Sequence, residues 1–419
     1  MSHVNYDVLI VGGGLVGLSL ARALAPSGLR MGIVESKQLA PSETPRYDDR
    51  TLALAYGSRR IFEGMGIWRE VEARGVTAIK RIHVSDRGRF GIARLDATDA
   101  GIEALGYVVA MPALGTTLYE AVRRCDGVDL ICPAVVRSVE RAADRVSVDV
   151  QRDGQAKTLS ARLVVGADGG RSRVRAAADI KATHKDYQQS AVVTTVTPEL
   201  PHRNVAYERF TESGPLALLP MTENRCTVVW STQRDDVEEI LDLDDATFLA
   251  RLQAGFGDRL GSFLRVGSRQ TYPLFLTRIE TQVRARLALV GNAAHTVHPV
   301  AGQGFNLGLR DVATLAEITV EEMRRGGDIG DIEVLARYVH QRRRDTEAVT
   351  TFTDGLIRIF ANSISPLVLA RNVGLIATDV WLPVKRALIQ RTSGLHGRLP
   401  RLARGLPLVR EPLAVSREQ

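Results

Sequence analysis

The spacing of apolar and polar residues near the start of the chain predicts a strand, a helix and a second strand in close succession. The run Asp7–Val11 is apolar and β-branched, as expected of a buried strand. Glycines follow it, and an Ala- and Leu-rich stretch with helical periodicity then continues to Leu24. After a break at residues 26–28 comes a second apolar run, Met31–Glu35. We interpret this pattern as a βαβ unit of a parallel sheet.

The glycines between the first strand and the helix each have a physical role that a side chain would prevent. Gly12 permits the tight turn out of the strand, Gly14 lets the backbone approach a pyrophosphate, and Gly17 lets the helix pack closely on the strand. The free N–H groups and the positive dipole end of the helix face the phosphates. Glu35 ends the second strand where an acid accepts hydrogen bonds from ribose hydroxyls, which favours FAD or NAD over NADP.

Two later segments repeat the pattern of a buried strand that ends in glycines. The first, Leu163–Ala167, leads into Asp168 and Gly169 and then a basic helix start. We weigh two roles for Asp168, a cap for that helix and a second contact to a dinucleotide. The second segment, Leu287–Val290, is followed by a glycine and Asn292.

A long helix is expected from about Phe305 toward Arg325, and the glycines Gly302 and Gly304 come just before it. A proline turn at Pro299, rather than a strand, precedes these glycines, so we reject a second dinucleotide-binding loop. We expect them instead to let the helix N-terminus approach a ligand, where the helix dipole favours developing negative charge.

The middle of the chain has the alternation of a sheet, and its end has helical periodicity. Residues 181–275 predict an inserted, largely antiparallel sheet with one helix at Asp245–Phe256. Residues 79–110 show strands and turns and are assigned to the same substrate domain. The predicted fold class is α/β, a Rossmann-like nucleotide-binding domain with an inserted antiparallel sheet domain and a C-terminal helical region. These three parts are residues 1–180 with 276–345, residues 181–275, and residues 346–419.

Composition and charge restrict the ligands and the location. The 419 residues suffice for two or three domains, and the net charge of +7 suits an anionic cofactor or an anionic membrane surface. Nucleic acid is excluded as a partner because the arginines are scattered and no nucleic-acid motif occurs. The odd number of cysteines, three, and the absence of a signal peptide favour a reduced, cytoplasmic chain. We expect no metal site and no uncharged spanning helix.

Three separated motifs together resemble the fingerprints of the group A flavoprotein monooxygenases, which share the para-hydroxybenzoate hydroxylase fold. These motifs are Gly12–Gly17 with Glu35, Gly166–Arg175, and Gly291–Asp311. Further segments resemble the ubiquinone-biosynthesis hydroxylases, and among them the UbiH type, so that the likeness covers nearly the whole chain. The segments are His83–Gly88, Glu208–Thr211, Gly214–Met221, Gly291–Ala294, His298–Pro299, Phe360–Asn362 and Arg371–Leu375.

The resemblance implies a complete set of cofactors and a substrate class. FAD is the cofactor, NAD(P)H the reductant and O2 the co-substrate, and a flavin C4a-hydroperoxide transfers oxygen to an aromatic ring. UbiH-type enzymes hydroxylate 2-polyprenyl-6-methoxyphenol at the carbon para to its existing oxygen. The second motif would contact both FAD and NAD(P)H, and the third would close over the flavin. The implied cofactor-binding residues are Gly12, Gly14, Gly17, Glu35, Arg50, Asp168, Gly169, Asn292, Gly302 and Gly304.

Three of these assignments carry alternatives. Arg50 lies soon after the second strand and is either a surface charge or a cofactor contact. The backbone carbonyls of His298 and Pro299 are expected to face the substrate ring, and for the His298 side chain we weigh a general base against a structural histidine. Asn292 stands where the wider family has aspartate; it keeps a carbonyl acceptor but loses the charge.

The polyprenyl tail implies an apolar slot and contact with a membrane. Candidate walls, each weighed against plain hydrophobic core, are Leu216–Met221, Trp230 and Tyr272–Phe275. The amphipathic segment Val368–Leu388 is considered for peripheral contact with the inner face of the membrane or with other ubiquinone-biosynthesis proteins. Three other functions are weighed: a hydroxylase for another ring position, a non-catalytic FAD-holding subunit, and a flavin halogenase, whose Trp-x-Trp-x-Ile signature is missing.

Overall fold

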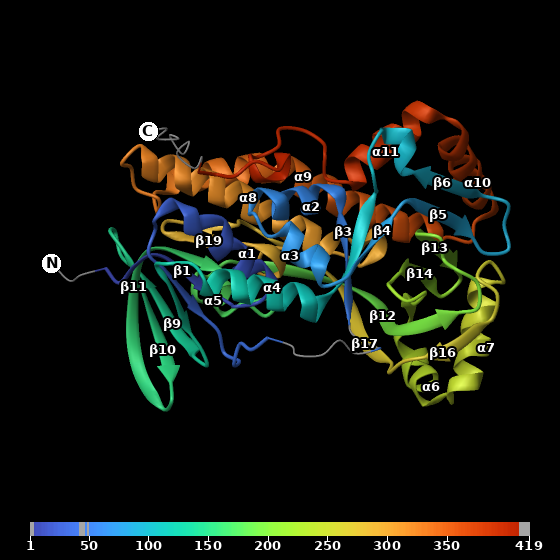
Figure 1. Cartoon of the computed structure of the whole chain (residues 1–419), viewed down its shortest axis with the longest axis horizontal. Coiled ribbons are helices and arrows are strands. Elements are labelled where there is room, and N and C mark those ends of the chain that lie inside the picture. Colours follow the sequence, from blue (N-terminus) through green and yellow to red (C-terminus); the bar gives the residue numbers. More distant parts are fainter. Residues whose placement is uncertain (1–3, 42–46, 48–49, 410–419) are drawn as a thin grey trace, which may run out of the picture.

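A parallel sheet forms the first half of the architecture (Figure 1). The computed structural model describes residues 4–41, 47 and 50–409. Five strands pair in parallel in the order β19-β11-β1-β2-β8, and β10, β9 and β18 extend the sheet in antiparallel fashion. Their bounds are β1 (Tyr6–Val11), β2 (Met31–Val34), β8 (Val128–Ile131), β9 (Val135–Arg141), β10 (Val146–Arg152), β11 (Gln155–Gly166), β18 (Val283–Arg284) and β19 (Leu287–Leu289).

The parallel strands are apolar at successive positions because both faces of this sheet are covered. Successive residues of a strand point to opposite faces. In β1, Val8 and Ile10 belong to one core cluster, whereas Leu9 and Val11 belong to another. The first cluster is shared with α1 (Leu15–Leu24), α4 (Met111–Arg123) and α8 (Gln303–Arg324), and the second with β9, β10 and α5 (Arg173–Ala177).

A second, mainly antiparallel sheet stands beside the first. Its order is β16-β12-β15-β14-β13-β5-β6, β17 also pairs with β12, and only the β13–β5 pair within this sheet is parallel among the described residues. Apolar side chains on one of its faces pack under α6 (Val237–Asp242) and α7 (Asp245–Phe256). The strands are β5 (Arg81–Asp86), β6 (Ile92–Asp96), β12 (Ala182–Pro198), β13 (Val205–Thr211), β14 (Gly214–Pro220), β15 (Cys226–Gln233), β16 (Phe263–Val266) and β17 (Gln270–Ile279).

The predicted fold class is confirmed. A third small sheet, β3 (Thr51–Ala55), β7 (Gly106–Ala110) and β4 (Val76–Ile79), joins the two halves. Strand β3 is followed by α2 (Tyr56–Gly64) and by the short α3 (Trp68–Ala73). Helix α4 begins before Pro112, which occupies its first turn, where a missing N–H costs nothing. The division into domains remains a prediction.

Three α-helices and the 3₁₀ helix η6 (Leu402–Arg404) complete the described chain. Helix α9 (Ile332–Phe360) packs along α8, whereas α10 (Ser365–Val380) packs on β6 and α11 (Leu382–Thr392) on the 3₁₀ helix η2 (Ala97–Ala100). In Figure 1, α10 and α11 lie with β5 and β6 at the end of the molecule away from β9 and β10. Within the described residues no single helix is long and apolar enough to cross a membrane; α10 and α11 meet that test only together, and they are bent by 95°.

Candidate functional site

In the glycine loop after β1, the fold itself requires glycine at positions 12 and 17 but not at position 14. Gly12 has φ of +108°, and a Cβ there would lie 2.4 Å from the Ala167 carbonyl oxygen. A Cβ on Gly17 would lie 1.9 Å from the Gly12 oxygen. At Gly14, by contrast, φ is −72° and a Cβ would meet no atom of the described residues within 4 Å. The space beside Gly14, at the N-terminus of α1, is therefore available to a ligand.

Glu35 holds this loop from the end of β2. One carboxylate oxygen accepts a hydrogen bond from the Gly13 N–H at 2.7 Å, and the other accepts from the Lys37 N–H at 2.9 Å. The oxygen bonded to Lys37 also accepts from the Ser36 hydroxyl at 3.1 Å, whereas the oxygen bonded to Gly13 keeps a lone pair that can accept a hydrogen bond from a ribose hydroxyl. Its contact with the loop is a role that sequence reasoning did not assign.

Asp168 uses its two oxygens differently. Oδ2 accepts hydrogen bonds from the N–H groups of Arg173 (2.7 Å) and Val174 (3.2 Å), and so caps the start of α5. Oδ1 is buried and has no hydrogen-bond partner among the described residues. A buried acceptor without a partner is costly, so Oδ1 is suited to receive a hydrogen bond from a ligand. The neighbouring Gly169 lines the cavity described below.

Arg175 connects the second motif to the third. Its buried guanidinium donates to the carbonyl oxygen of Gly170 at 2.7 Å and to that of Ala293 at 3.0 Å. Ala293 belongs to the short 3₁₀ turn η4 (Gly291–Ala293) that follows β19, and Asn292 in this turn is exposed to the cavity. Because the Arg175 side chain bonds to both turns, it fixes the positions of Asp168 and Asn292 relative to each other.

Asp311, in the buried face of α8, fixes the same turn from the other side. Its carboxylate accepts hydrogen bonds from the Gly291 N–H (3.1 Å), from His295 (2.7 Å) and from Arg342 of α9 (2.8 Å). Burial would raise the pKa of Asp311, but the charges and hydrogen bonds of His295 and Arg342 outweigh it and lower the pKa to about 2. The carboxylate is therefore ionised and ties β19, α8 and α9 together.

The N-terminus of α8 points into the cavity. The helix begins at Gln303, two residues earlier than the expected Phe305, and Gly302 is its N-cap with φ of +62°. The side chain of Asn306 donates to the Ala53 and Gly302 carbonyl oxygens and accepts from the Ala55 N–H and the Ser58 hydroxyl. These bonds lock the first turn of α8 onto the β3–α2 junction. A Cβ on Gly304 would meet only Val297, at 3.9 Å.

His298 and Pro299 take different positions. Pro299 lines the cavity, and its carbonyl oxygen accepts a hydrogen bond from the Gly302 N–H at 2.8 Å. His298 is fully buried outside the cavity lining, and its Nδ1 accepts from the Val300 N–H at 3.2 Å. Burial lowers the pKa of His298 to about 4. A neutral, buried imidazole away from the cavity favours the structural interpretation over the general base.

A cavity of about 910 Å³ joins these elements. Arg50 lies at its edge and stacks over the Tyr272 ring, with 4.6 Å between the guanidinium carbon and the ring centroid. The lining includes seven of the twelve predicted site residues: Gly14, Arg50, Gly169, Asn292, Pro299, Gly302 and Gly304. The other five are not part of the lining: Gly12, Gly17, Glu35, Asp168 and His298.

The far end of the cavity is apolar and differs in part from the expected slot. Ala217 and Leu219 of β14 line it, as do side chains of β5, β6, α10 and α11. Trp230 does not; it packs in the core of the second sheet against Phe248, with ring centroids 6.1 Å apart. Residues 272–275 are also outside the lining. The C-terminal helices thus supply walls that sequence reasoning did not assign.

Comparison with known proteins places this architecture in a family. The FAD binding domain family matches residues 5–353. The ubiquinone hydroxylase UbiL of Rhodospirillum rubrum is 41% identical over 408 residues, which cover 96% of this chain and 93% of that protein. The 3-demethoxyubiquinol 3-hydroxylase of Escherichia coli is 30% identical over 396 residues, covering 94% of this chain and 100% of that protein. The chain belongs to the family of FAD-dependent aromatic hydroxylases.

A solved structure shows the fold of this hydroxylase independently. The p-nitrophenol 4-monooxygenase PnpA from Pseudomonas putida matches with a TM-score of 0.78 at 20% identity, over 95% of this chain and 100% of that one. The predicted family, and FAD as its cofactor, are confirmed by the FAD binding domain match over residues 5–353, and the solved structure confirms the fold. The individual contacts of the cofactor are proposals, which rest on the geometry given above.

Four features of the hydroxylase are suited to binding FAD. Open space beside Gly14 faces the uncapped N-terminus of α1, as a pyrophosphate requires. Glu35 and the unpartnered Oδ1 of Asp168 supply acceptors. The N-terminus of α8 has no acidic residue in its first turn, so its partial positive charge is uncompensated toward the cavity.

Three positioning residues of the hydroxylase were missed from sequence: Arg175, Asn306 and Asp311. All three lie within quoted motifs, but each has a partner at least twenty residues away in the chain: Ala293 for Arg175, Ala53 for Asn306 and Gly291 for Asp311. The signal that could have found them is a polar residue on an otherwise apolar helix face, since such a residue must be paired when it is buried.

Proposed function

We propose that this enzyme hydroxylates the aromatic ring of a polyprenyl phenol in ubiquinone biosynthesis, using FAD, NAD(P)H and O2, with 2-polyprenyl-6-methoxyphenol as the substrate. The observation that carries the proposal is the continuous cavity, which runs from the glycine loop at Gly14 to the apolar walls of α10 and α11. One end suits an anionic dinucleotide and the other a lipid tail. Two relatives that cover at least 93% of the chain, UbiL of Rhodospirillum rubrum and UbiM of Neisseria meningitidis, are named as ubiquinone hydroxylases.

The residues of the chain act by position and electrostatics. FAD, when bound, supplies the electrons and activates O2 for transfer of one oxygen atom to the ring. The positive end of the α8 dipole, at Gly302–Gly304, stabilises negative charge on the reduced cofactor. The apolar walls exclude water from the site, which prevents side reactions that compete with oxygen transfer to the ring. His298 is buried and outside the cavity lining, so no proton-transfer step is assigned to it.

The ring position is tested by the metabolite that accumulates when the gene is deleted. Loss of the proposed activity should lead to accumulation of 2-polyprenyl-6-methoxyphenol, and re-expression should remove it. Accumulation of a demethoxyubiquinol instead would assign the ring position named for the Escherichia coli relative. Accumulation of no ubiquinone precursor would contradict the proposed pathway.

A non-catalytic FAD-holding role makes a different prediction for the purified protein. An enzyme oxidises NAD(P)H faster when substrate is added and forms hydroxylated product in proportion. A scaffold releases FAD on denaturation but shows no substrate-dependent oxidation. Protein that binds FAD yet shows no such stimulation with any polyprenyl phenol would favour the scaffold.

A further inference from the structure

Helices α10 and α11 expose an unusual amount of apolar surface. Of the fifteen large hydrophobic side chains that are exposed in the described part of the chain, nine lie between residues 364 and 384. Val380 and Trp381, at the bend between the helices, are 77% and 65% exposed. The nine are Ile364, Leu367, Leu369, Val373, Ile376, Val380, Trp381, Leu382 and Val384. Contiguous apolar surface of this kind marks a site of interaction.

The faces of α10 have separate environments. Asn372 and Val368 are buried against the β5–β6 hairpin, where Asn372 accepts a hydrogen bond from the Gly91 N–H at 2.7 Å. A second stripe, containing Gly374, Leu375 and Thr378, lines the cavity. The exposed stripe consists of positions 369, 373, 376 and 380. Because an α-helix has 3.6 residues per turn, these positions lie on the face of α10 opposite the cavity stripe. This helix therefore separates the cavity from an apolar surface.

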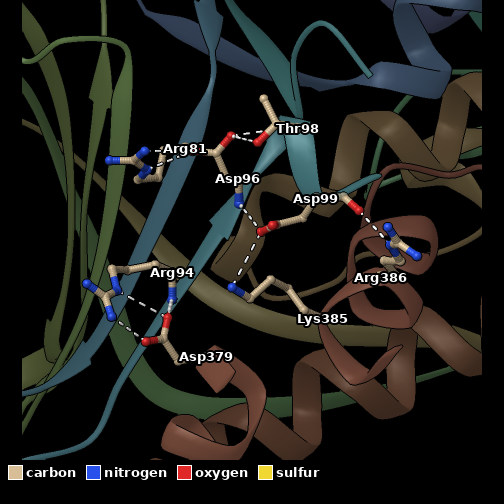
Figure 2. A network of polar contacts seen from close by, with 8 residues as sticks. All are labelled: Arg81, Arg94, Asp96, Thr98, Asp99, Asp379, Lys385 and Arg386. Atoms are coloured by element: carbon tan, nitrogen blue, oxygen red, sulfur yellow. Dashed lines mark hydrogen bonds and ion pairs between the residues drawn. The ribbon is translucent and has the colours of Figure 1, made fainter. Parts of the chain in front are cut away.

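A polar network joins both helices to the neighbouring strand and 3₁₀ helix (Figure 2). Asp379 of α10 accepts hydrogen bonds from the backbone N–H of Arg94 at 2.8 Å and from its guanidinium at 2.5 Å. On α11, Lys385 pairs with the carboxylate of Asp99 at 3.4 Å, and Arg386 donates to the Asp99 carbonyl oxygen at 2.7 Å. These contacts join both helices to β6 and η2, so the exposed stripe cannot turn inward without breaking them.

The charge around this surface is positive. Between residues 358 and 404 the chain carries eight lysines and arginines and one acidic residue, Asp379, which pairs with Arg94. Three of the eight, Arg358, Arg371 and Lys385, pair with carboxylates outside this segment, and the other five leave the segment basic. Arg386 and Arg391 are exposed on α11 beside the apolar face. A helix that combines exposed apolar residues with a basic flank is typical of the interface of an anionic bilayer, and tryptophan is enriched there.

We propose that α10 and α11 form a docking surface for an anionic lipid bilayer, in which Val380 and Trp381 enter the headgroup region and the helices lie in the plane of the membrane. Val384 of α11, one of the nine exposed residues, and the exposed Ile359 of α9 also line the cavity, so the cavity reaches the surface at the α11 edge of the docking face. Under the proposed function, on which this last step rests, a polyprenyl tail passes between bilayer and cavity at these residues. Docking itself requires no substrate.

Vesicle flotation of the FAD-loaded full chain tests the docking surface. The protein should float with phosphatidylglycerol-containing vesicles and bind less to pure phosphatidylcholine vesicles or at high salt, because salt screens the basic flank. The variant Val380→Ser/Trp381→Ser should reduce the bound fraction at least tenfold. The matched control Leu200→Ser/Leu264→Ser removes two exposed apolar side chains of the second sheet region and should bind like the wild type.

A spectroscopic reading gives the location of binding. Trp68 and Trp230 are buried, so Trp381 alone among the three tryptophans is exposed to solvent. Its emission should shift to shorter wavelength when anionic vesicles are added, and Trp381→Phe should abolish that shift. FAD content and circular dichroism of each variant establish that it has folded.

Three outcomes would overturn the proposal. The wild type remains unbound with anionic vesicles; the Val380/Trp381 variant binds them as the wild type does; or sedimentation shows a dimer that this variant dissociates while no vesicle binding occurs. The last result would assign the apolar face to a second copy of the chain. None of these outcomes depends on turnover, so the proposed function is tested separately.

Discussion

Replacing Gly14 by valine should separate the ligand-binding role of the glycine loop from its folding role. Gly14 has φ of −72° and ψ of −176°, an extended conformation that any residue adopts, and a Cβ there meets no described atom within 4 Å. The FAD-free protein should therefore change its free energy of unfolding by less than about 1 kcal/mol. The valine side chain would instead occupy the space that the pyrophosphate needs.

The loss of FAD affinity follows from the contacts that the valine prevents. A hydrogen bond from a backbone N–H to a charged group contributes about 1.5–3 kcal/mol. Displacing the phosphate from one such N–H at the start of α1 should weaken the binding of FAD by about tenfold to hundredfold. Displacing it from more than one would weaken binding further.

Gly17→Ala is the matched variant for this experiment. Its Cβ would lie 1.9 Å from the Gly12 oxygen, so α1 must move away from β1 and the FAD-free protein should be destabilised. Titration of FAD fluorescence gives the affinity, and thermal unfolding of the FAD-free proteins gives the stability. Wild-type FAD affinity in Gly14→Val, or a loss of stability equal to that of Gly17→Ala, would refute the reasoning.

Three further substitutions test other parts of the site. Asn292→Asp keeps an acceptor at the cavity, so FAD affinity should change by less than about tenfold; a larger loss would show that the amide donates. Gly304→Val fits beside Val297 but displaces the cofactor from the α8 dipole, and should lower the flavin midpoint potential by some tens of millivolts; an unchanged potential in a spectroelectrochemical titration excludes the dipole role. His298 has a folded pKa of about 4, below its ordinary value, so stability should be full above pH 6.5 and fall by up to about 3 kcal/mol toward pH 4. His298→Gln should remove this dependence in pH-resolved unfolding, whereas His396→Gln, at an exposed position, should retain it.

The parts of the fold that sequence predicted are those with local, periodic signals. The apolar run at β1, the glycines and the helical pattern of α1 lie within thirty residues, and helix α7 (Asp245–Phe256) has the predicted bounds. Strand β3 was missed because Thr51–Ala55 is short and its pairing partner, β7, is about fifty residues away. Its sequence alone does not distinguish a strand from the first turn of α2.

The site residues likewise divide into those with a local sequence signal and those without one. Glycines such as Gly14 and Gly302 can be recognised in the sequence, because a tight turn or the close approach of a ligand to the backbone restricts the residue type. Asp311 gives no such signal, since its function is to receive Gly291, His295 and Arg342 from three segments that only the fold brings together. The walls of α10 and α11 were assigned to a membrane or partner contact rather than to the cavity, because helical periodicity does not tell which face meets which neighbour.

The central claim is that this chain transfers one oxygen atom from O2 to the ring of a polyprenyl phenol. The most direct measurement supplies the FAD-loaded enzyme with NAD(P)H, 2-polyprenyl-6-methoxyphenol and ¹⁸O2, and analyses the product by mass spectrometry. We predict one ¹⁸O atom per product molecule, on the ring carbon para to the phenol hydroxyl group. Unchanged phenol, with NAD(P)H consumed only to form hydrogen peroxide, or a product whose new oxygen comes from water, would contradict the account.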